Sequence, residues 1–154
     1  MSGVGEQLWE GDFGHPVIMN GKKTGFVTTG FGYTRNIKAT GVSYTHEGVD
    51  YYAVEGSTVF ALNDGKVVFS ELTELGGNTI IIEHGFGLKT WYCHLSEVNV
   101  HAGDTVSKGQ VIGIVGQTGF TNQSGVHEGM SVFDIPVCPY PAQDDGGIRI
   151  VYPE

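Results

Sequence analysis

The sequence predicts an all-β protein, built as a single domain of antiparallel β-sheets with long loops between the strands. Three observations carry this prediction. Glycine is abundant, at 25 of 154 residues, whereas there are only 5 prolines. Val, Ile, Thr and Tyr are frequent, and these residues favour strands over helices. Short stretches of alternating apolar and polar residues recur between glycine-containing turns, a pattern typical of half-buried strands.

The length of the chain bounds its domain organisation. A chain of 154 residues can bury one full hydrophobic core, and nothing in it indicates a second domain. Residues 1–15 are predicted to form an N-terminal arm, anchored by Leu8, Trp9 and Phe13, and residues 16–154 the domain itself. No stretch reaches the roughly 20 apolar residues that a membrane-spanning helix requires.

Charge and cysteine content exclude several classes of partner and fold. The formal charge of -9, from 17 acidic and 8 basic residues, would repel phosphate groups, so we expect neither nucleic acid nor an anionic membrane surface as a partner. Cys93 and Cys138 are too few for a disulfide framework and are not spaced as a metal-binding pair. We expect both to be free, buried thiols.

The strands can be predicted in order along the chain. A polar loop at 34–44 is expected to lead from the first strand into the segment that contains His46 and Asp50. Two hairpins should follow, because each pair of apolar stretches is separated by a turn sequence. The strands are predicted at residues 25–33, 58–62, 66–70, 79–84, 88–95, 110–116, 125–133 and 148–152.

The strand at 88–95 carries a histidine whose orientation matters. Strand alternation places Tyr92 and His94 on one face, and Trp91, Cys93 and Leu95 on the other. The second face is the more apolar, so it is predicted to point into the core. His94 would then point outward.

His46 and Asp50 are the first candidates for a functional site. An imidazole and a carboxylate four residues apart could both reach one cation, with Gly48 between them where the backbone can turn tightly. Two ligands do not make a site, so a third ligand must come from elsewhere in the chain. The alternative is a structural role, in which His46 and any partner histidine form hydrogen bonds and bind no metal.

Several short motifs follow one another in a fixed order along residues 16–139. They are Gly30-Phe31-Gly32, His46-x-x-x-Asp50-Tyr51, Ile82-Glu83-His84-Gly85-Phe86-Gly87, Tyr92-Cys93-His94-Leu95-Ser96, Gly103-Asp104-x-Val106-x-x-Gly109-Gln110-x-Ile112-Gly113 and Gly116-x-Thr118-Gly119. In this order they resemble the lysostaphin-type (LytM-like) zinc endopeptidases, which cut peptide cross-links in bacterial peptidoglycan. The resemblance implies a β-sandwich-like fold with loops around a metal cleft, Zn²⁺ as cofactor, a peptidoglycan peptide as substrate, and a monomer in the cell envelope or outside the cytoplasm as part of a longer parent protein.

The resemblance also assigns roles to residues. His46 and Asp50 match two metal ligands, and His94 matches a catalytic histidine. The family's third motif is His-x-His, but this chain has a single histidine there. Aligning residues 118–127 without a gap places His127 on the second histidine, the third metal ligand, and residues 135–139 match the family's closing segment at the same distance. Gly125 then stands where a second catalytic histidine is expected.

Gly125 leaves two functional classes open. The first is a zinc endopeptidase of reduced activity, for which a histidine restored at position 125 is expected to raise hydrolysis. The second is a degenerate, non-catalytic member that serves as a binding or scaffolding module with an envelope protein partner. Strand alternation turns Glu128 away from the site, whereas a side chain from Tyr33, Tyr44, Tyr52 or Asn122 could replace the missing imidazole. His15 and His84 are expected to be structural, and His101 solvated.

Overall fold

The computed structural model describes residues 6–17, 26–37, 42–121, 123–139 and 142–143. The described chain is built from strands joined by tight turns, and it contains no α-helix. The strands are β1 (Phe26–Thr29), β2 (Thr34–Ile37), β3 (Val42–Thr45), β4 (Val49–Tyr52), β5 (Thr58–Phe60), β6 (Gly65–Thr73), β7 (Gly77–Gly85), β8 (Leu88–Val98), β9 (Thr105–Val106), β10 (Val111–Val115), β11 (Gly125–Val132) and β12 (Ile135–Val137). The all-β prediction is confirmed.

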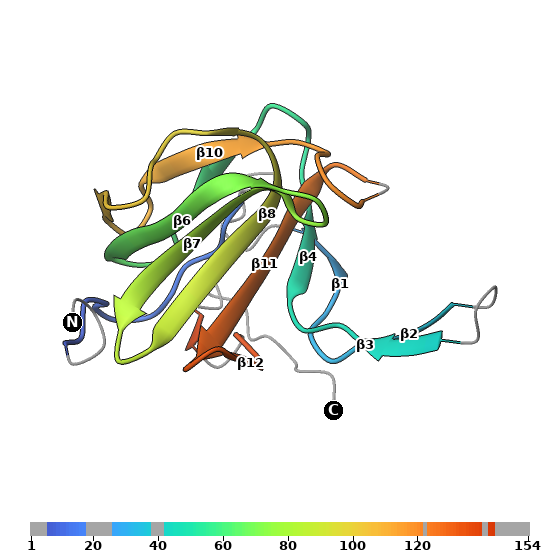
Figure 1. Cartoon of the computed structure of the whole chain (residues 1–154), viewed down its shortest axis with the longest axis horizontal. Coiled ribbons are helices and arrows are strands. Elements are labelled where there is room, and N and C mark those ends of the chain that lie inside the picture. Colours follow the sequence, from blue (N-terminus) through green and yellow to red (C-terminus); the bar gives the residue numbers. More distant parts are fainter. Residues whose placement is uncertain (1–5, 18–25, 38–41, 122, 140–141, 144–154) are drawn as a thin grey trace.

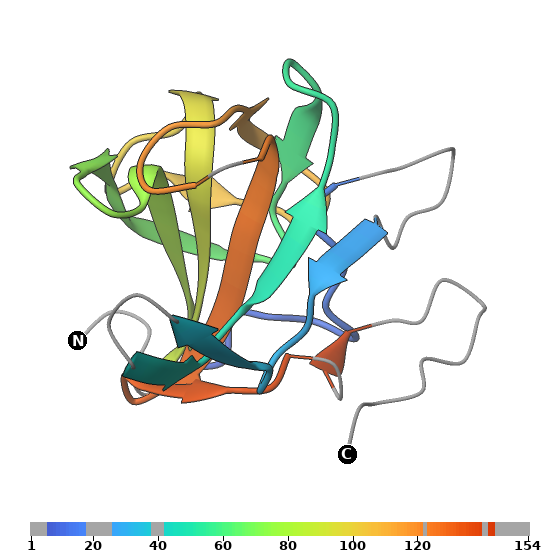
Figure 2. The ribbon, with the colours of Figure 1, turned by 90° about the vertical axis from the view of Figure 1, so that its right-hand side faces the viewer.

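One large sheet of ten strands forms the body of the molecule. Its main path runs β1-β4-β11-β8-β7-β6-β9, and every pairing is antiparallel. Strand β10 pairs with β5 and β8, and β12 pairs with β11. Figure 1 shows β6, β7, β8 and β11 side by side, with β4 and β1 beyond β11. The rotated view in Figure 2 shows that β11 and β4 run side by side across the middle of the molecule.

The core lies against the inner face of this sheet. Tyr51, Tyr92, Ile80 and Ile82 are completely or almost completely buried there. The N-terminal segment packs on the same body, because the Phe13 ring lies 4.9 Å from the His84 ring. Because side chains alternate between the two faces of a strand, the apolar residues bury one face of each central strand away from water.

One predicted loop is instead a hairpin. Residues 34–44 were expected to be irregular, but β2 and β3 pair antiparallel from Thr34↔Thr45 to Ile37↔Val42. These strands form a separate two-stranded sheet that projects from the body (Figure 1). The polar composition of this segment indicated a loop, but the segment also contains Thr, Val, Ile and Tyr, which favour an extended backbone. The strand predicted at 148–152 lies outside the described residues.

The described part of the chain holds no helix of the length and hydrophobicity needed to cross a membrane.

Candidate metal centre

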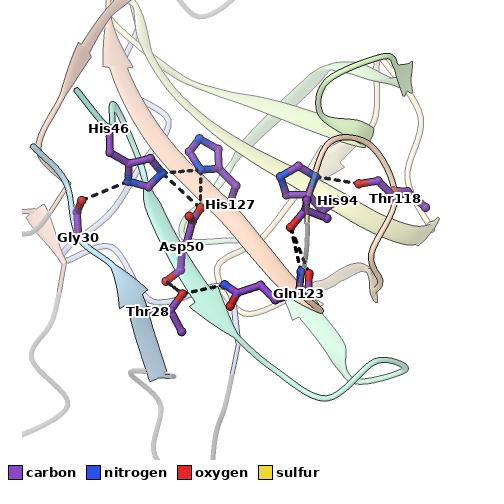
Figure 3. Close-up of polar contacts among 9 residues, drawn as sticks. Thr28, Gly30, His46, Asp50, His94, Thr118, Gln123 and His127 are labelled. Carbon is purple, nitrogen blue, oxygen red and sulfur yellow. Dashed lines mark hydrogen bonds and ion pairs between the residues drawn. The ribbon is translucent and has the colours of Figure 1, made fainter. Parts of the chain in front are cut away.

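The pairing of β4 with β11 brings the three predicted metal ligands together. Asp50 on β4 stands opposite His127 on β11 in the register. His46 lies just before β4, and its backbone is fixed by hydrogen bonds to Gly32 and Tyr33. Because both strands are regular here, the side chains of Asp50 and His127 share one face of the sheet. Figure 3 shows the three side chains converging.

Gly48 allows this approach by being small. A Cβ atom at this position would lie 2.6 Å from the Glu128 carbonyl oxygen and 2.8 Å from the His127 ring. The chain bends at Gly48, as predicted, but its φ angle is not positive, so the bend itself does not require glycine. The residue between His46 and Asp50 must instead leave room for β11 and its imidazole.

The separations within the cluster fit a tetrahedral metal ion. His46 Nε2 lies 3.3 Å from Asp50 Oδ1 and 3.2 Å from His127 Nδ1. Zinc bonds of 2.0–2.1 Å place two ligand atoms of a tetrahedral site about 3.3 Å apart. The third separation, 2.7 Å between His127 Nδ1 and Asp50 Oδ1, is a hydrogen bond in which the imidazole donates. Two imidazoles and one carboxylate, partly open to solvent, therefore fit zinc once that proton leaves.

A main-chain carbonyl orients the first of these imidazoles. His46 Nδ1 lies 3.1 Å from the Gly30 carbonyl oxygen, which can only accept a hydrogen bond. His46 Nδ1 therefore carries the proton, and its Nε2 presents a lone pair to the cluster. This lone pair and the Asp50 carboxylate face each other at 3.3 Å. Two acceptors held this close are stabilised when a cation lies between them.

The carboxylate of the cluster is held in its charged form. Burial acts to raise the pKa of Asp50, but the hydrogen bond that His127 donates and the electrostatic effect of the neighbouring imidazoles outweigh it, so the pKa lies well below its ordinary range. The side chains of Asp50 and His127 keep 20% and 23% of their surface exposed. A substrate or water can therefore reach the cluster from solvent.

His94 reaches the same side of the sheet through an irregular backbone. It has a φ of 69°, which is rare for a residue other than glycine, and the β7–β8 register shifts beside it. The predicted faces of β8 are wrong for this reason: Tyr92 and Leu95 are both buried in the core, and Trp91 is not. The shift between Tyr92 and Leu95 places His94 on the exposed side without simple alternation.

Main-chain groups also orient His94. Its Nδ1 donates to the Thr118 carbonyl at 2.8 Å, and its backbone N–H donates to the Gly76 carbonyl at 2.6 Å. Nε2 therefore carries the lone pair, and the ring lies 6.3 Å from that of His127. Burial lowers the pKa of His94, and nearby His127 adds to this, while the Thr118 carbonyl acts in the opposite direction. A neutral imidazole with a free lone pair is suited to accept a proton.

Gly125 cannot carry a side chain on this backbone. Its φ is 154°, and a Cβ atom would lie 2.0 Å from the Tyr51 carbonyl oxygen. A histidine here would have to displace the main chain of β4. The structure therefore argues against the expectation that a histidine restored at position 125 raises hydrolysis.

The remaining histidines stand apart from the cluster. His84 is fully buried, with Nδ1 bonded to the Asp64 carbonyl at 2.7 Å and Nε2 bonded to Thr90 Oγ1 at 2.8 Å. His15 is buried beside Tyr51, 3.3 Å from its hydroxyl. His101 is 86% exposed. Among the described residues, only His46, Asp50 and His127 form a group of three side chains that could hold a metal ion.

Glu128 and the two cysteines were also singled out in the sequence, and all three lie outside the cluster. Glu128 points into the core, opposite to His127, as strand alternation predicted. Both cysteines are free, but each is only partly buried. Sequence reasoning missed Trp91, whose ring lies 6.5 Å from that of His127 and packs where a Cβ at Gly129 would stand. An aromatic residue that had been predicted for the core thus lies beside His127.

Comparison with known proteins identifies the family. Residues 44–139, which include all three cluster residues and His94, match peptidase family M23. The chain belongs to this family. M23 membership confirms the resemblance to lysostaphin-type enzymes that the motifs indicated.

Individual relatives agree with the family. The chain is 34% identical over 111 residues to the peptidoglycan DD-endopeptidase ShyB of Vibrio cholerae, across 72% of this chain and 26% of that protein. It is 40% identical over 84 residues to the glycyl-glycine endopeptidase ALE-1 of Staphylococcus capitis, across 53% of this chain and 23% of that protein. The match thus spans about a quarter of the length of these relatives.

Solved structures share the fold. A zinc-containing peptidase from Vibrio cholerae superposes with a TM-score of 0.76 at 31% identity, covering 84% of this chain and 40% of that one. The catalytic domain of lysostaphin from Staphylococcus simulans superposes with a TM-score of 0.63 at 33% identity, covering 77% of this chain and 86% of that domain. Both share the fold of this chain.

Proposed function

We propose that this M23 chain is the zinc-dependent endopeptidase domain of a cell-envelope protein that hydrolyses peptide bonds of bacterial peptidoglycan, acting as a monomer. The convergence of His46 Nε2, Asp50 Oδ1 and His127 Nδ1, at separations of 2.7–3.3 Å, carries the proposal. The named activities of ShyB and ALE-1 support peptidoglycan peptides as the substrate class.

The geometry supports a division of labour. His46, Asp50 and His127 would hold the metal, which would supply Lewis acidity toward a substrate carbonyl. His94 stands beside them with its Nε2 lone pair available, because Nδ1 is committed to the Thr118 carbonyl. It takes a proton from the attacking water and passes it to the leaving amine. General acid–base assistance of this kind is worth about 10²–10⁴-fold in rate.

Gly125 favours a second candidate function, a non-catalytic module that keeps the fold and binds an envelope protein. The missing imidazole is the only departure from the catalytic pattern that supports it. The orientation of His94 weighs against it, since a lone pair held beside the cluster is a feature of a working site.

The test is digestion of purified peptidoglycan sacculi by the zinc-loaded protein, with released peptides identified by mass spectrometry. We expect new peptide ends whose identity fixes the cleaved bond. Protein stripped by a chelator should be inactive and should recover when zinc is restored. A protein that binds zinc yet leaves all peptides intact would contradict the proposal and support the non-catalytic alternative.

A further inference from the structure

The departure at position 125 raises the question of what occupies the space beside it. Gly125 and Tyr52 stand directly opposite each other in the β4–β11 register. On β4, Val49 and Tyr51 are buried, whereas Asp50 and Tyr52 lie on the other face, which is the face of the cluster. Tyr52 is therefore the side chain nearest in the sheet to the place where Gly125 has none.

The side chains of the two residues before Gly125 form hydrogen bonds to neighbouring segments. Ser124 Oγ donates to the Ala53 carbonyl at 2.9 Å, and Gln123 Nε2 donates to Thr28 Oγ1 at 2.8 Å. Thr28 Oγ1 in turn donates to the Asp50 carbonyl at 3.3 Å, and Figure 3 shows this chain of contacts beneath the cluster. The segment before Gly125 is thus tied to the end of β4 and to β1. It has little freedom to move aside for a larger residue.

Tyr52 has the chemistry and the reach to act at this place. Its side chain is partly buried, and its hydroxyl makes no hydrogen bond to any residue that the structure describes. Residues two apart on a strand are about 6.6 Å apart, a distance that a phenol spans, so the hydroxyl can reach the space above Asp50. A phenol O–H can donate a hydrogen bond to an oxygen that gains negative charge.

We infer that Tyr52 is a catalytic residue, which donates a hydrogen bond to the carbonyl oxygen of the peptide bond under attack. The inference rests on the proposed function. Gly125 is then a steric requirement of the β4–β11 pairing, and the second polar group of the site comes from β4 instead of β11. Removing a single donor of this kind from other enzymes lowers kcat by about 10²–10³-fold.

The first experiment compares Tyr52→Phe, which removes only the hydroxyl, with Tyr33→Phe as the competing tyrosine. Tyr33 precedes β2 and is 61% exposed. In the zinc-loaded enzyme, Tyr52→Phe should lower kcat by about 10²-fold with KM and zinc content unchanged. Tyr33→Phe should retain the unmodified rate. Unchanged kcat in Tyr52→Phe, or a loss confined to Tyr33→Phe, would overturn the inference.

A second readout does not depend on hydrolysis. The cobalt-substituted protein is titrated with acetohydroxamate, and binding is followed by visible absorption. Because the probe presents a charged oxygen at the metal, Tyr52→Phe should weaken its binding about 10–100-fold, as expected for loss of one charge-assisted hydrogen bond. Equal affinities would contradict the role of Tyr52. This comparison stands even if the unmodified protein cleaves no sacculi, which would refute the proposed function instead.

The steric half of the inference is tested in the metal-free protein. Gly125→Ala and Gly125→His should each lower the melting temperature by roughly 5–10 °C, because a side chain meets the Tyr51 carbonyl. Gly103→Ala is the matched control for a positive φ alone, since nothing lies within 4 Å of its added Cβ. A Gly125→His variant that is fully stable and hydrolyses sacculi faster would refute the inference.

Discussion

The metal-binding half and the His94 half of the site are built in different ways. His127 and Asp50 face each other across regular, paired strands, so their positions follow from register alone. His94 depends on a left-handed residue, a register shift and two carbonyl groups from other segments. The positions of the proposed metal ligands on β4 and β11 thus follow from strand pairing, whereas the position of the proposed catalytic imidazole depends on the backbone of its neighbours.

The largest effect is expected from breaking the metal-binding half. His127→Ala should lose zinc, with affinity lowered at least 100-fold and hydrolysis abolished, because only two ligands remain. Zinc content after competition with a chelator measures this. His101→Ala, in a side chain that is 86% exposed, is the matched control and should bind zinc normally. Undiminished zinc in His127→Ala would show that the assigned ligand set is wrong.

Breaking the other half should separate catalysis from metal binding. His94→Ala is expected to lower kcat by about 10²–10⁴-fold while zinc content stays unchanged, because His94 is not one of the three clustered ligands and its ring lies 6.3 Å from that of His127. Steady-state hydrolysis and elemental analysis on the same sample give both values. Loss of zinc together with activity would mean that the two halves are one structural unit.

His84, which belongs to neither half of the site, is expected to make the stability of the fold depend on pH. Burial lowers the pKa of His84 to about 4 from 6.5, with hydrogen bonding to Asp64 acting in the opposite direction. Between these values the unfolded chain binds more protons than the folded one, so stability is complete above pH 6.5 and falls as pH decreases toward 4. The expected loss is about 3 kcal/mol over the window.

Denaturant unfolding at several pH values measures this loss. His84→Gln, which cannot titrate, should show a flatter dependence between pH 6.5 and 5, above the range where carboxylates dominate. An equal slope in both proteins would mean that His84 does not control acid stability.

The smallest effect is expected beneath the cluster. Both carboxyl oxygens of Glu128 are buried without a hydrogen-bond partner among the residues that the structure describes, and burial raises its pKa to about 8. Glu128→Leu should therefore stabilise the fold by about 1–3 kcal/mol, with zinc binding retained. Urea unfolding measures the change, and Glu97→Leu on the surface is the matched control. A destabilised variant would reveal a partner for Glu128.

Much of the fold could be predicted from residue patterns. The all-β class and most of the strands follow from period-two alternation and turn residues. Residues 34–44 were missed because their polar composition resembles a loop, although they pair as β2 and β3. The faces of β8 were exchanged because alternation cannot anticipate the register shift that separates Tyr92 from Leu95.

The site divides in the same way. His46 and Asp50 could be recognised by their spacing, and His127 by the resemblance of its motif, because candidate side-chain ligands leave a sequence signal. The carbonyls of Gly30 and Thr118 orient His46 and His94, but any residue supplies a carbonyl, so the sequence carries no trace of them. Gly48 was recognised as the place of a bend, but the sequence did not reveal that its small size is also needed for contact with β11.

The central claim is that His46, Asp50 and His127 hold zinc while a fourth position stays open. X-ray absorption at the zinc edge of the purified, zinc-loaded protein tests it most directly. The account predicts nitrogen and oxygen neighbours at about 2.0–2.1 Å, with the outer-shell signal of two imidazoles. Cys93 stands opposite His127 in the β8–β11 register, so a sulfur neighbour at about 2.3 Å would mean a different ligand set. That result, or a protein that retains no zinc, would contradict the account.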